Sequence, residues 1–339
     1  MGTSDDFYEG TEKLLELWFT RQDGNSDGCD LRKIPRSVLD SLLQLVRCEI
    51  VSECSNADID AYVLSESSMF ISKRRFILKT CGSTALMVCI KPLLAAAAEF
   101  AGFDRVEDIF YSRKNFARPD LQPQPHHDFS AEVDSLDRLF KDGAAYCLGQ
   151  MNRDCWYLYT ISPSVRPFWG NGLNAIEEPD QTLEIMMMEL NPERMKFFTK
   201  EGSLSARDAT EKSGISKILD GVTIDDVLFE PCGYSMNGIL KNGCYMTIHI
   251  TPESNYSYVS FESNIPMRSY HEVLVKVLRC FEPGKFIMTV FANEGSITLN
   301  SHSALDGSKD ILDYHRVDLQ SCRFRNYHLT YAHYARFPS

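Results

Sequence analysis

Three stretches of the chain combine residue types that could carry out covalent or acid–base chemistry. The first is Glu66-Ser67-Ser68, inside "AYVLSESSMFISKRRFILKTCGST" at residues 61–84, with Cys81 fourteen positions after Ser67. A serine hydroxyl can attack the carbonyl carbon of a strained peptide bond just before it and convert that amide to an ester. A polar hairpin turn has the same residue types, so the triplet alone does not decide between a turn and a reactive centre.

The second stretch is "YMTIHITPE", residues 245–253. Its alternation predicts a strand with Tyr245, Thr247, His249 and Thr251 on one face. His249 would then lie on a polar face, where an imidazole can act as a general base because its ordinary pKa is near neutral pH. A hydrogen-bonded structural histidine fits the same pattern.

The third stretch, "LFEPCGYSMNG" at 228–238, predicts a loop that carries Phe229, Cys232 and Ser235. Its interest depends on the other two stretches. The motifs GxGxxG, GxxxxGK[ST], GxSxG and HExxH are absent, which excludes the standard nucleotide, phosphate, α/β-hydrolase and zincin sites. His126-His127 lies in a proline-rich segment that we expect to be a surface loop and not a metal site.

Composition narrows the class of protein. The chain has 339 residues, 44% of them hydrophobic, and a formal charge of -12, which works against binding nucleic acid and favours a cationic small molecule. Eleven cysteines without a CxxC pair favour a reducing cytosol over a disulfide framework or a zinc site. The acidic start is unlike an export signal, and no apolar run reaches the ~18 residues of a membrane span.

The elements that must position these residues follow from periodicity. We expect strands at 61–64, 68–72, 75–81, 144–150, 154–161, 244–251, 257–263 and 285–292. Helices are expected over 9–20, after Pro35, over 83–100 with a kink at Pro92, over 191–199 with Asn191 as cap, and over 270–281 with a Ser269–Glu272 capping box. In the first helix Leu14, Leu15 and Trp18 would face inward and Glu9, Glu12 and Glu16 would form a stripe. Residues 165–181 are expected to form a surface loop, and no sequence repeat is evident. Hairpin-spaced strands with helices between the groups predict an antiparallel α+β fold in one compact unit.

Seven segments together resemble the eukaryotic S-adenosylmethionine decarboxylases, in the same order from about residue 7 to about 330. They are "YEGTEKLLELWF", "YVLSESSMFISKRRFILKTCG", "FYSRKNF", "DCWYLY", "PDQTLEI", "PCGYSMNG" and "TIHITPE". The resemblance implies a four-layer α/β/β/α sandwich, with two antiparallel sheets flanked by helices, as a single domain over 1–339.

The resemblance also implies a self-processing enzyme. The chain would cut itself between Glu66 and Ser67 into a β chain, 1–66, and an α chain, 67–339, and Ser67 would become a pyruvoyl group that forms a Schiff base with the substrate. No metal and no pyridoxal phosphate would be needed. Ser235 and His249 match the family's processing residues, and Cys81 matches its proton donor. The product would supply spermidine and spermine synthesis in the cytosol.

Binding residues are carried over from the family in the same way. Tyr8 and Phe229 match the aromatic pair that stacks on adenine, Glu253 the carboxylate on the ribose, and Leu64 a backbone contact. Tyr8 replaces the usual Phe, so its hydroxyl needs a partner. Glu9 and Glu12 match acidic residues of the catalytic centre. The activator putrescine and a homodimer are also implied; the residues that match the putrescine site and its network are Asp180, Thr182, Glu184, Glu262, Glu12, Glu16 and Lys79.

Two other functions also fit part of this pattern. One is a catalytically inert regulatory relative that activates a partner subunit, and the other is a Ser/Cys hydrolase that uses Cys81 and His249. Inert relatives typically lose the serine or the proton-transfer residues, whereas Ser67, Cys81, Ser235 and His249 are all present here. The decarboxylase is therefore the preferred interpretation.

Overall fold

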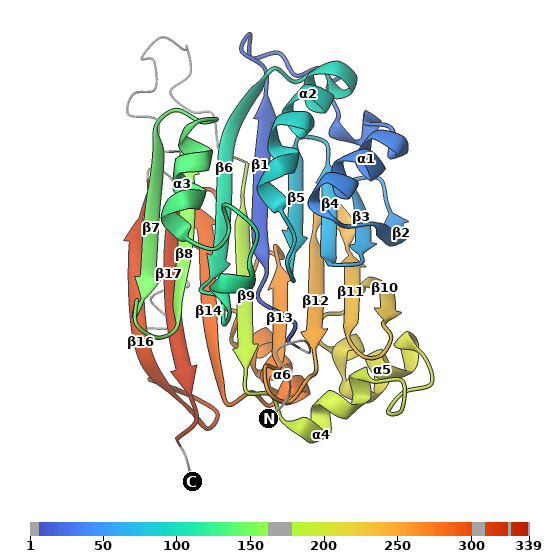
Figure 1. Cartoon of the computed structure of the whole chain (residues 1–339), viewed down its shortest axis with the longest axis vertical. Coiled ribbons are helices and arrows are strands. Elements are labelled where there is room, and N and C mark those ends of the chain that lie inside the picture. Colours follow the sequence, from blue (N-terminus) through green and yellow to red (C-terminus); the bar gives the residue numbers. More distant parts are fainter. Residues whose placement is uncertain (1–6, 162–177, 300–308, 325–326, 338–339) are drawn as a thin grey trace. The chain divides into compact units, whose positions relative to one another are not determined.

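The computed structural model describes residues 7–161, 178–299, 309–324 and 327–337. The chain forms two compact units, unit 1 from residues 1–163 with 241–243 and unit 2 from 164–240 with 244–339. Each unit is built on one antiparallel sheet with helices packed against a face of it (Figure 1). The predicted α+β class, with two antiparallel sheets flanked by helices, is confirmed.

Unit 1 contains an eight-stranded sheet and three α-helices. Its strand order is β2-β3-β4-β5-β1-β6-β8-β7. The strands are β1 (Lys13–Thr20), β2 (Ile50–Ser55), β3 (Ile59–Leu64), β4 (Ser67–Ser72), β5 (Arg75–Thr80), β6 (Arg105–Lys114), β7 (Gly143–Gly149) and β8 (Cys155–Ile161). The helices are α1 (Arg36–Val46), α2 (Ile90–Ala101) and α3 (Phe129–Asp137).

Unit 2 contains a nine-stranded sheet in the order β10-β11-β12-β13-β9-β14-β17-β16-β15. The strands are β9 (Gln181–Met188), β10 (Thr223–Leu228), β11 (Tyr234–Ile239), β12 (Tyr245–Thr251), β13 (Tyr258–Ser263), β14 (Lys285–Asn293), β15 (Asp310–Ile311), β16 (Tyr314–Arg323) and β17 (Tyr327–Ala335). The helices are α4 (Pro192–Met195), α5 (Ala206–Ser213) and α6 (His271–Phe281).

Apart from β15, which has no counterpart in unit 1, the two units share one strand order, although their sequences show no evident repeat. In each, the first strand lies at the centre, between the last strand of a four-strand meander and the strand after it. In each, a helix (α2 or α6) connects the meander to that following strand. By this correspondence β1, β4 and β5 of unit 1 match β9, β12 and β13 of unit 2.

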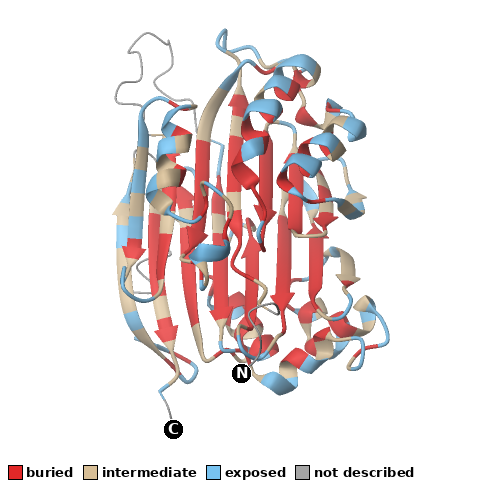
Figure 2. Ribbon diagram, viewed as in Figure 1, coloured by how far each residue is buried: buried red, intermediate tan, exposed pale blue. Residues whose placement is uncertain are grey.

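Alternation along the strands separates an apolar face from a polar one. In unit 2, Met246, Ile248 and Ile250 of β12 pack with the helices, whereas Thr247 and His249 lie on the opposite face. In unit 1, Leu15 and Leu17 of β1 likewise pack with the helices. Both faces of the central strands are buried, while the helices expose one side (Figure 2). The sheets therefore place polar side chains where water is excluded.

The expected helix over 9–20 is wrong, because this segment contains the central strand β1. Leu15, Leu17 and Phe19 are at most 2% exposed and alternate, as a strand requires. β1 is paired on both sides, with β5 and β6. Glu12 and Glu16 are four residues apart, a spacing that places them on one face of a helix or of a strand. The acidic stripe therefore fits a helix and a strand equally well.

The loop expected over 228–238 is wrong in its second half, because Tyr234 and Met236 pack in the core and the strand β11 begins at Tyr234 and carries Ser235. The other predicted elements agree with the structure apart from three details. The helix expected over 83–100 begins at Ile90, which puts Pro92 in its first turn, where no kink arises. Helix α6 is capped by Tyr270 without a side-chain bond, so the Ser269–Glu272 capping box is wrong; Ser269 Oγ accepts from His271 N–H instead. Most of the expected 165–181 loop lies outside the described residues.

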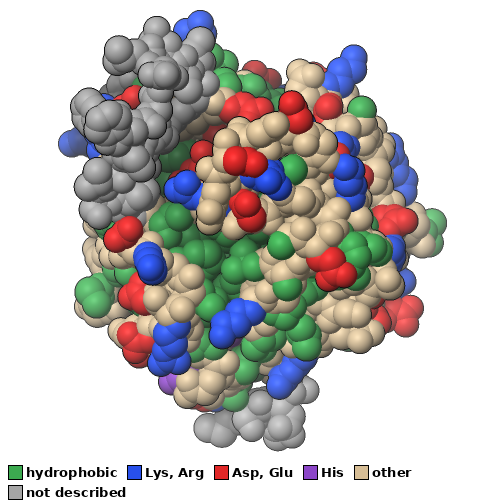
Figure 3. Space-filling model, turned by 90° about the horizontal axis from the view of Figure 1, so that it is seen from above, with side chains coloured by type: hydrophobic (Ala, Val, Ile, Leu, Met, Phe, Trp, Pro, Cys, Tyr) green, Lys and Arg blue, Asp and Glu red, His purple; other side chains and the backbone are tan. Residues whose placement is uncertain are grey.

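The surface carries charges of both signs. On the face shown in Figure 3, basic and acidic side chains are interspersed around apolar ones. Among the described helices, none has the length and apolar character needed to cross a bilayer.

Candidate functional site

The Glu66–Ser67 peptide bond lies at the tip of a tight hairpin. Strands β3 and β4 pair with Leu64 opposite Ser67, so Ser65 and Glu66 form the connection. Ser67 has a φ of 115°, a backbone conformation that residues other than glycine rarely adopt. Such a conformation costs about 1–3 kcal/mol and persists only where the surroundings impose it. The strain therefore sits at the bond that the sequence marks for cleavage.

The Ser67 hydroxyl is held by a buried carboxylate. Ser67 Oγ donates a hydrogen bond to Glu12 Oε1 at 2.6 Å, and both side chains are at most 4% exposed. Glu12 Oε2 lies 3.5 Å from the ammonium of Lys79, which is fully buried. Glu12 directly precedes β1, whose pairing with β5 brings it close to Lys79. Glu12 is thus placed to accept the proton of the serine hydroxyl.

The backbone of Cys81 contacts the carbonyl oxygen next to Ser67. The Cys81 N–H donates to Glu66 O at 3.1 Å. The following turn is fixed by Gly82 N–H, which donates to Glu9 O at 2.8 Å, and by Lys13 Nζ, which donates to Gly82 O at 3.1 Å. A fixed N–H aimed at a carbonyl oxygen stabilises the negative charge that develops there when the carbon is attacked.

Tyr8 joins the side chains of Glu66 and Cys81. Its hydroxyl donates to Glu66 Oε2 and lies 2.9 Å from Cys81 Sγ, so the partner that this tyrosine needs is present. Gly82 makes room for the contact: a Cβ there would lie 2.9 Å from Glu66 Oε2 and 3.2 Å from the Tyr8 ring. Burial, followed by the charges of Glu66 and Glu12, raises the pKa of the Cys81 thiol well above its usual value. The thiol is therefore neutral. Burial also raises the pKa of Glu66.

His249 lies on the polar face of β12, as predicted, opposite Ser235 of β11. Its Nδ1 is 2.8 Å from Ser235 Oγ, and its Nε2 is 2.8 Å from Thr247 Oγ1. The single hydroxyl proton of Thr247 is directed to Met236 O, at 3.1 Å, and Asn237 Oδ1, at 2.9 Å. Thr247 Oγ1 must then accept from Nε2–H, which assigns the tautomer. Nδ1 is left as the basic nitrogen, and Ser235 donates to it.

A set of buried carboxylates lies along the centre of the unit 2 sheet. Glu184 of β9 and Glu262 of β13 are directly opposite each other, and they are 7% and 1% exposed. Glu262 accepts from Tyr245 Oη at 2.6 Å, and Asp180 accepts from Tyr327 Oη at 3.1 Å. Alternation along the chain puts Thr182 on the same face as Asp180 and Glu184. Like charges directly opposite each other are destabilising, so Glu184 and Glu262 depend on their other interactions.

The remaining predicted residues have more local partners. Glu16 is paired with Arg75, with Glu16 Oε1 2.9 Å from Arg75 Nε. The Glu9 carboxylate accepts from the N–H groups of Ala117 and Arg118 at 2.8 and 3.1 Å, so it holds the chain that follows β6. Phe229 and Glu253 are half-buried in loops of unit 2, and Leu64 is buried at the end of β3.

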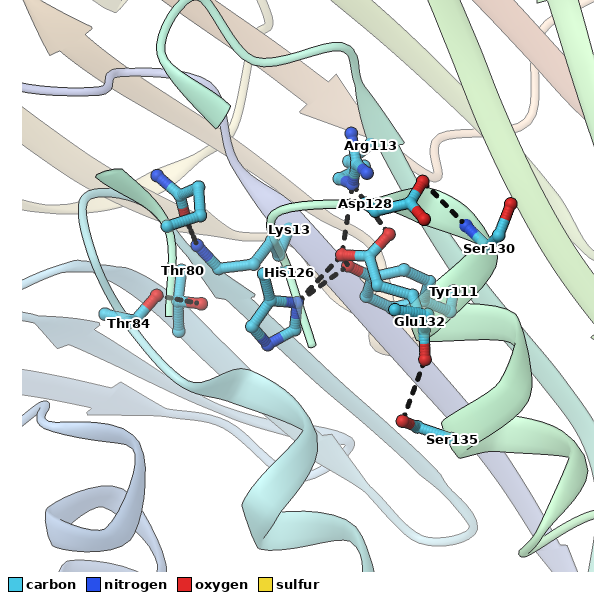
Figure 4. Close-up of polar contacts among 12 residues, drawn as sticks. Lys13, Thr80, Thr84, Tyr111, Arg113, His126, Asp128, Ser130, Glu132 and Ser135 are labelled. Atoms are coloured by element: carbon cyan, nitrogen blue, oxygen red, sulfur yellow. Dashed lines mark hydrogen bonds and ion pairs between the residues drawn. The ribbon is translucent and has the colours of Figure 1, made fainter. Parts of the chain in front are cut away.

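Sequence reasoning missed a buried polar cluster in unit 1, and the expectation that His126 lies in a surface loop is wrong. Arg113, Tyr111 and His126 converge on the carboxylate of Glu132 from α3 (Figure 4). Arg113 Nε is 2.8 Å from Glu132 Oε2, and His126 Nδ1 is 2.8 Å from Oε1. His126 is fully buried, and burial lowers its pKa, so the ring is neutral. The "HHDF" pattern gave no signal that would tell the buried His126 from the exposed His127.

In the described part of the chain, no three or more His, Cys, Asp or Glu side chains are grouped so as to hold a metal ion. Predicted site residues and the side chains that contact them form two groups. The Ser67 group, in unit 1, consists of Tyr8, Glu12, Glu66, Ser67 and Cys81. The His249 group, in unit 2, consists of Ser235, Asn237, Thr247 and His249.

Nearly the whole chain aligns with known proteins of one family. Residues 5–335 match the family model for adenosylmethionine decarboxylase. The chain is 48% identical to the S-adenosylmethionine decarboxylase proenzyme of Xenopus laevis, over 97% of this chain and 96% of that protein. It is 49% identical to the corresponding proenzyme of Drosophila melanogaster, over 97% and 95%. A Trypanosoma brucei AdoMetDC monomer of known structure shares the fold, with a TM-score of 0.58 at 24% identity over 80% of this chain and 99% of that one.

Proposed function

Because the chain belongs to the adenosylmethionine decarboxylase family, we propose that it cuts itself at Glu66–Ser67 and then converts S-adenosylmethionine to its decarboxylated form and carbon dioxide. The observation that carries this proposal is the state of the Ser67 residue. Its backbone is strained, its hydroxyl contacts a carboxylate, and the carbonyl oxygen before it accepts the Cys81 N–H. Each of these features favours attack of the hydroxyl on that carbonyl.

In the cutting step, Glu12 takes the proton of Ser67 Oγ as the oxygen attacks the Glu66 carbonyl carbon. The Cys81 N–H holds the oxygen that becomes negative. When the C–N bond breaks, the Ser67 nitrogen gains a proton, which balances the one taken from Oγ; the amide has then become an ester and the strain at Ser67 is released. We assign His249 Nδ1, with Ser235, to removal of the Ser67 α-proton, which breaks the ester and separates residues 1–66 from 67–339.

The residues present fit a prosthetic group made from Ser67 itself, because the reacting serine and its activating partners are all supplied by the chain. When formed, a pyruvoyl group supplies a carbonyl that accepts electrons as carbon dioxide leaves. The Cys81 thiol, kept neutral by its surroundings, returns a proton to the carbon that loses carbon dioxide. Tyr8 and Phe229 would bind the adenine, Glu253 the ribose, and Leu64 and Glu9 would line the site.

We also propose that putrescine binds as an activator at Asp180, Thr182, Glu184 and Glu262, with Glu12, Glu16 and Lys79 in the connecting network. A diamine carries two positive charges, which would offset the facing carboxylates of β9 and β13. The product would serve spermidine and spermine synthesis. A cytosolic location and a homodimer complete the proposal; eleven cysteines without a CxxC pair suit a reducing compartment.

The test is the intact mass of the purified chain together with release of labelled carbon dioxide from substrate. We expect two chains, 1–66 and 67–339, and a borohydride-reducible terminus on the longer one. Ser67→Ala should stay uncut, while Ser68→Ala, which changes the neighbouring buried serine, should still be cut. A wild-type chain that stays whole and releases no carbon dioxide would instead support the inert regulatory relative.

A further inference from the structure

We propose that Tyr8 is a positioning residue for the decarboxylation step. Its hydroxyl holds the Cys81 thiol and, after each turnover, passes it a proton from the Glu66 side chain. The proposal rests on the function proposed above and adds to it a role for one oxygen atom. Stacking on adenine needs only the ring of residue 8. The hydroxyl has a separate set of contacts.

The direction of the hydrogen bonds follows from counting protons. A phenol has one proton, and that of Tyr8 is donated to Glu66 Oε2. The 2.9 Å contact between Tyr8 Oη and Cys81 Sγ must then be made by the thiol proton. The three groups form a directed chain from thiol to phenol to carboxyl. Direct proton transfer between the thiol and the carboxyl is disfavoured, since Cys81 Sγ and Glu66 Oε2 are 3.9 Å apart.

The surroundings favour a relay over an isolated thiol. Cys81 is 8% exposed, so bulk water has little access to its sulfur. Glu66 is less buried than Cys81, and its raised pKa lets it hold a proton closer to neutral pH. The other groups that face this chain are Glu12 and Cys48 toward the thiol and Lys13 toward Glu66. Gly82 leaves the space in which the phenol and the carboxyl meet.

The relay balances in protons. The S–H bond of Cys81 breaks as a C–H bond forms on the carbon that loses carbon dioxide. The thiolate then takes the phenol proton, the phenol oxygen takes the proton of the Glu66 carboxyl, and the Glu66 carboxylate takes one from water. One proton is consumed for each carbon dioxide released, as decarboxylation requires.

The first test uses the uncut Ser67→Ala chain, in which this geometry exists without any prosthetic group. Cys81 is converted to its methyl disulfide with methyl methanethiosulfonate across a pH range, and the modified Cys81 peptide is quantified by mass spectrometry without reduction. In Tyr8→Phe the thiolate loses its phenol donor, so the midpoint of labelling should rise by about one pH unit, a tenfold loss of thiolate at fixed pH. The midpoint, unlike the rate, is insensitive to altered access of the reagent.

The control is Tyr159→Phe in the same uncut chain. Tyr159 is another buried phenol of unit 1, and it donates to Asp137 Oδ1 at 2.8 Å. No contact between Tyr159 and Cys81 is involved, so the labelling midpoint of Cys81 should not move.

The second test uses the cut enzyme. Tyr8→Phe keeps the ring, so we expect an unchanged KM, a kcat lowered roughly three- to tenfold and a larger solvent deuterium isotope effect on kcat, as recharging of the thiol becomes slow. An unmoved labelling midpoint would overturn the proposal. So would a moved midpoint with kcat and isotope effect unchanged. A parent enzyme that neither cuts itself nor releases carbon dioxide would overturn the function instead, while the labelling would still decide whether Tyr8 holds the thiol.

Discussion

Ser67 and His249 lie on corresponding strands, β4 and β12, of two sheets that share a strand order apart from β15, yet the chemistry of their two groups differs. The Ser67 group contains two carboxylates, a thiol with a raised pKa and a strained backbone. The His249 group is a chain of uncharged hydrogen-bonding partners around one imidazole. The difference teaches that one scaffold can support both a strained bond with its charged activators and a base held in one tautomer.

The largest expected effects come from replacing the proposed base of each group in turn, Glu12 in the Ser67 group and His249 in the other. Glu12→Gln should slow the first step about 100-fold or more, since a positioned base contributes 10²–10⁴-fold, and should leave an amide that hydroxylamine does not cut. His249→Ala should allow the first step and stop at the ester, so hydroxylamine should release both pieces. Intact mass with and without hydroxylamine measures this.

Glu16→Gln is the control on the unit 1 side, because the Glu16 carboxylate is bound to Arg75 and Trp18. It should be cut at the parental rate. If Glu12→Gln and His249→Ala stalled at the same species, the assignment of separate steps to the two groups would be wrong.

Stability is expected to depend on the charges of unit 1. Glu132→Ala removes the acceptor shared by Arg113, Tyr111 and His126 and leaves a buried guanidinium unpaired. Loss of one partner of a buried ion pair costs about 3–5 kcal/mol in the free energy of unfolding, measured by urea denaturation. Asp120→Ala, which breaks an exposed pair with Arg118, should leave the unfolding curve unchanged. A small effect of Glu132→Ala would mean that this cluster does not stabilise the unit.

A further test concerns pH. Burial lowers the pKa of Lys13 from its ordinary value of 10.5 to about 8. Between these values the unfolded chain binds more protons than the folded one, so the free energy of unfolding should rise with pH. The rise attributable to Lys13 is about 3 kcal/mol, at about 1.4 kcal/mol per pKa unit. Urea denaturation from pH 7 to 10.5 should show it in the parent and not in Lys13→Met; equal slopes would contradict the assignment.

The smallest expected effect concerns the uncharged group. Thr247→Val removes the acceptor for His249 Nε2–H, so the basic tautomer at Nδ1 is no longer selected. Ester breakdown should slow about tenfold, equivalent to the ~1.4 kcal/mol of one ordinary hydrogen bond. The accumulated ester, trapped with hydroxylamine over time, gives the rate. Ser260→Ala, on the next strand opposite His249, is the matched control and should leave that rate unchanged.

Much of the fold was predictable because its strands alternate cleanly and are joined by short turns. The position of His249 on a polar face followed from period-two alternation, and the Glu66–Ser67 hairpin followed from two β-rich runs around a polar turn. The strand that carries Ser235 was missed because the Pro and Gly residues before it indicate a loop. β1 was misassigned because acidic residues four apart suit both periods, and its flanking strands are remote in sequence. Burial of His126 depended on Glu132 and Arg113, which no local pattern connects to it. The duplicated strand order left no trace in residue identity.

The backbone and the side chain of Cys81 have separate duties, since its N–H contacts the Glu66 carbonyl and its sulfur contacts Tyr8. A library randomised at this codon and sorted for maturation should therefore recover many amino acids, with proline excluded because it has no N–H. Sorting the same library for turnover should recover far fewer. Substitutions at this position would thus give an enzyme that is cut but does not turn over substrate, so that self-cleavage and catalysis can be separated by mutation.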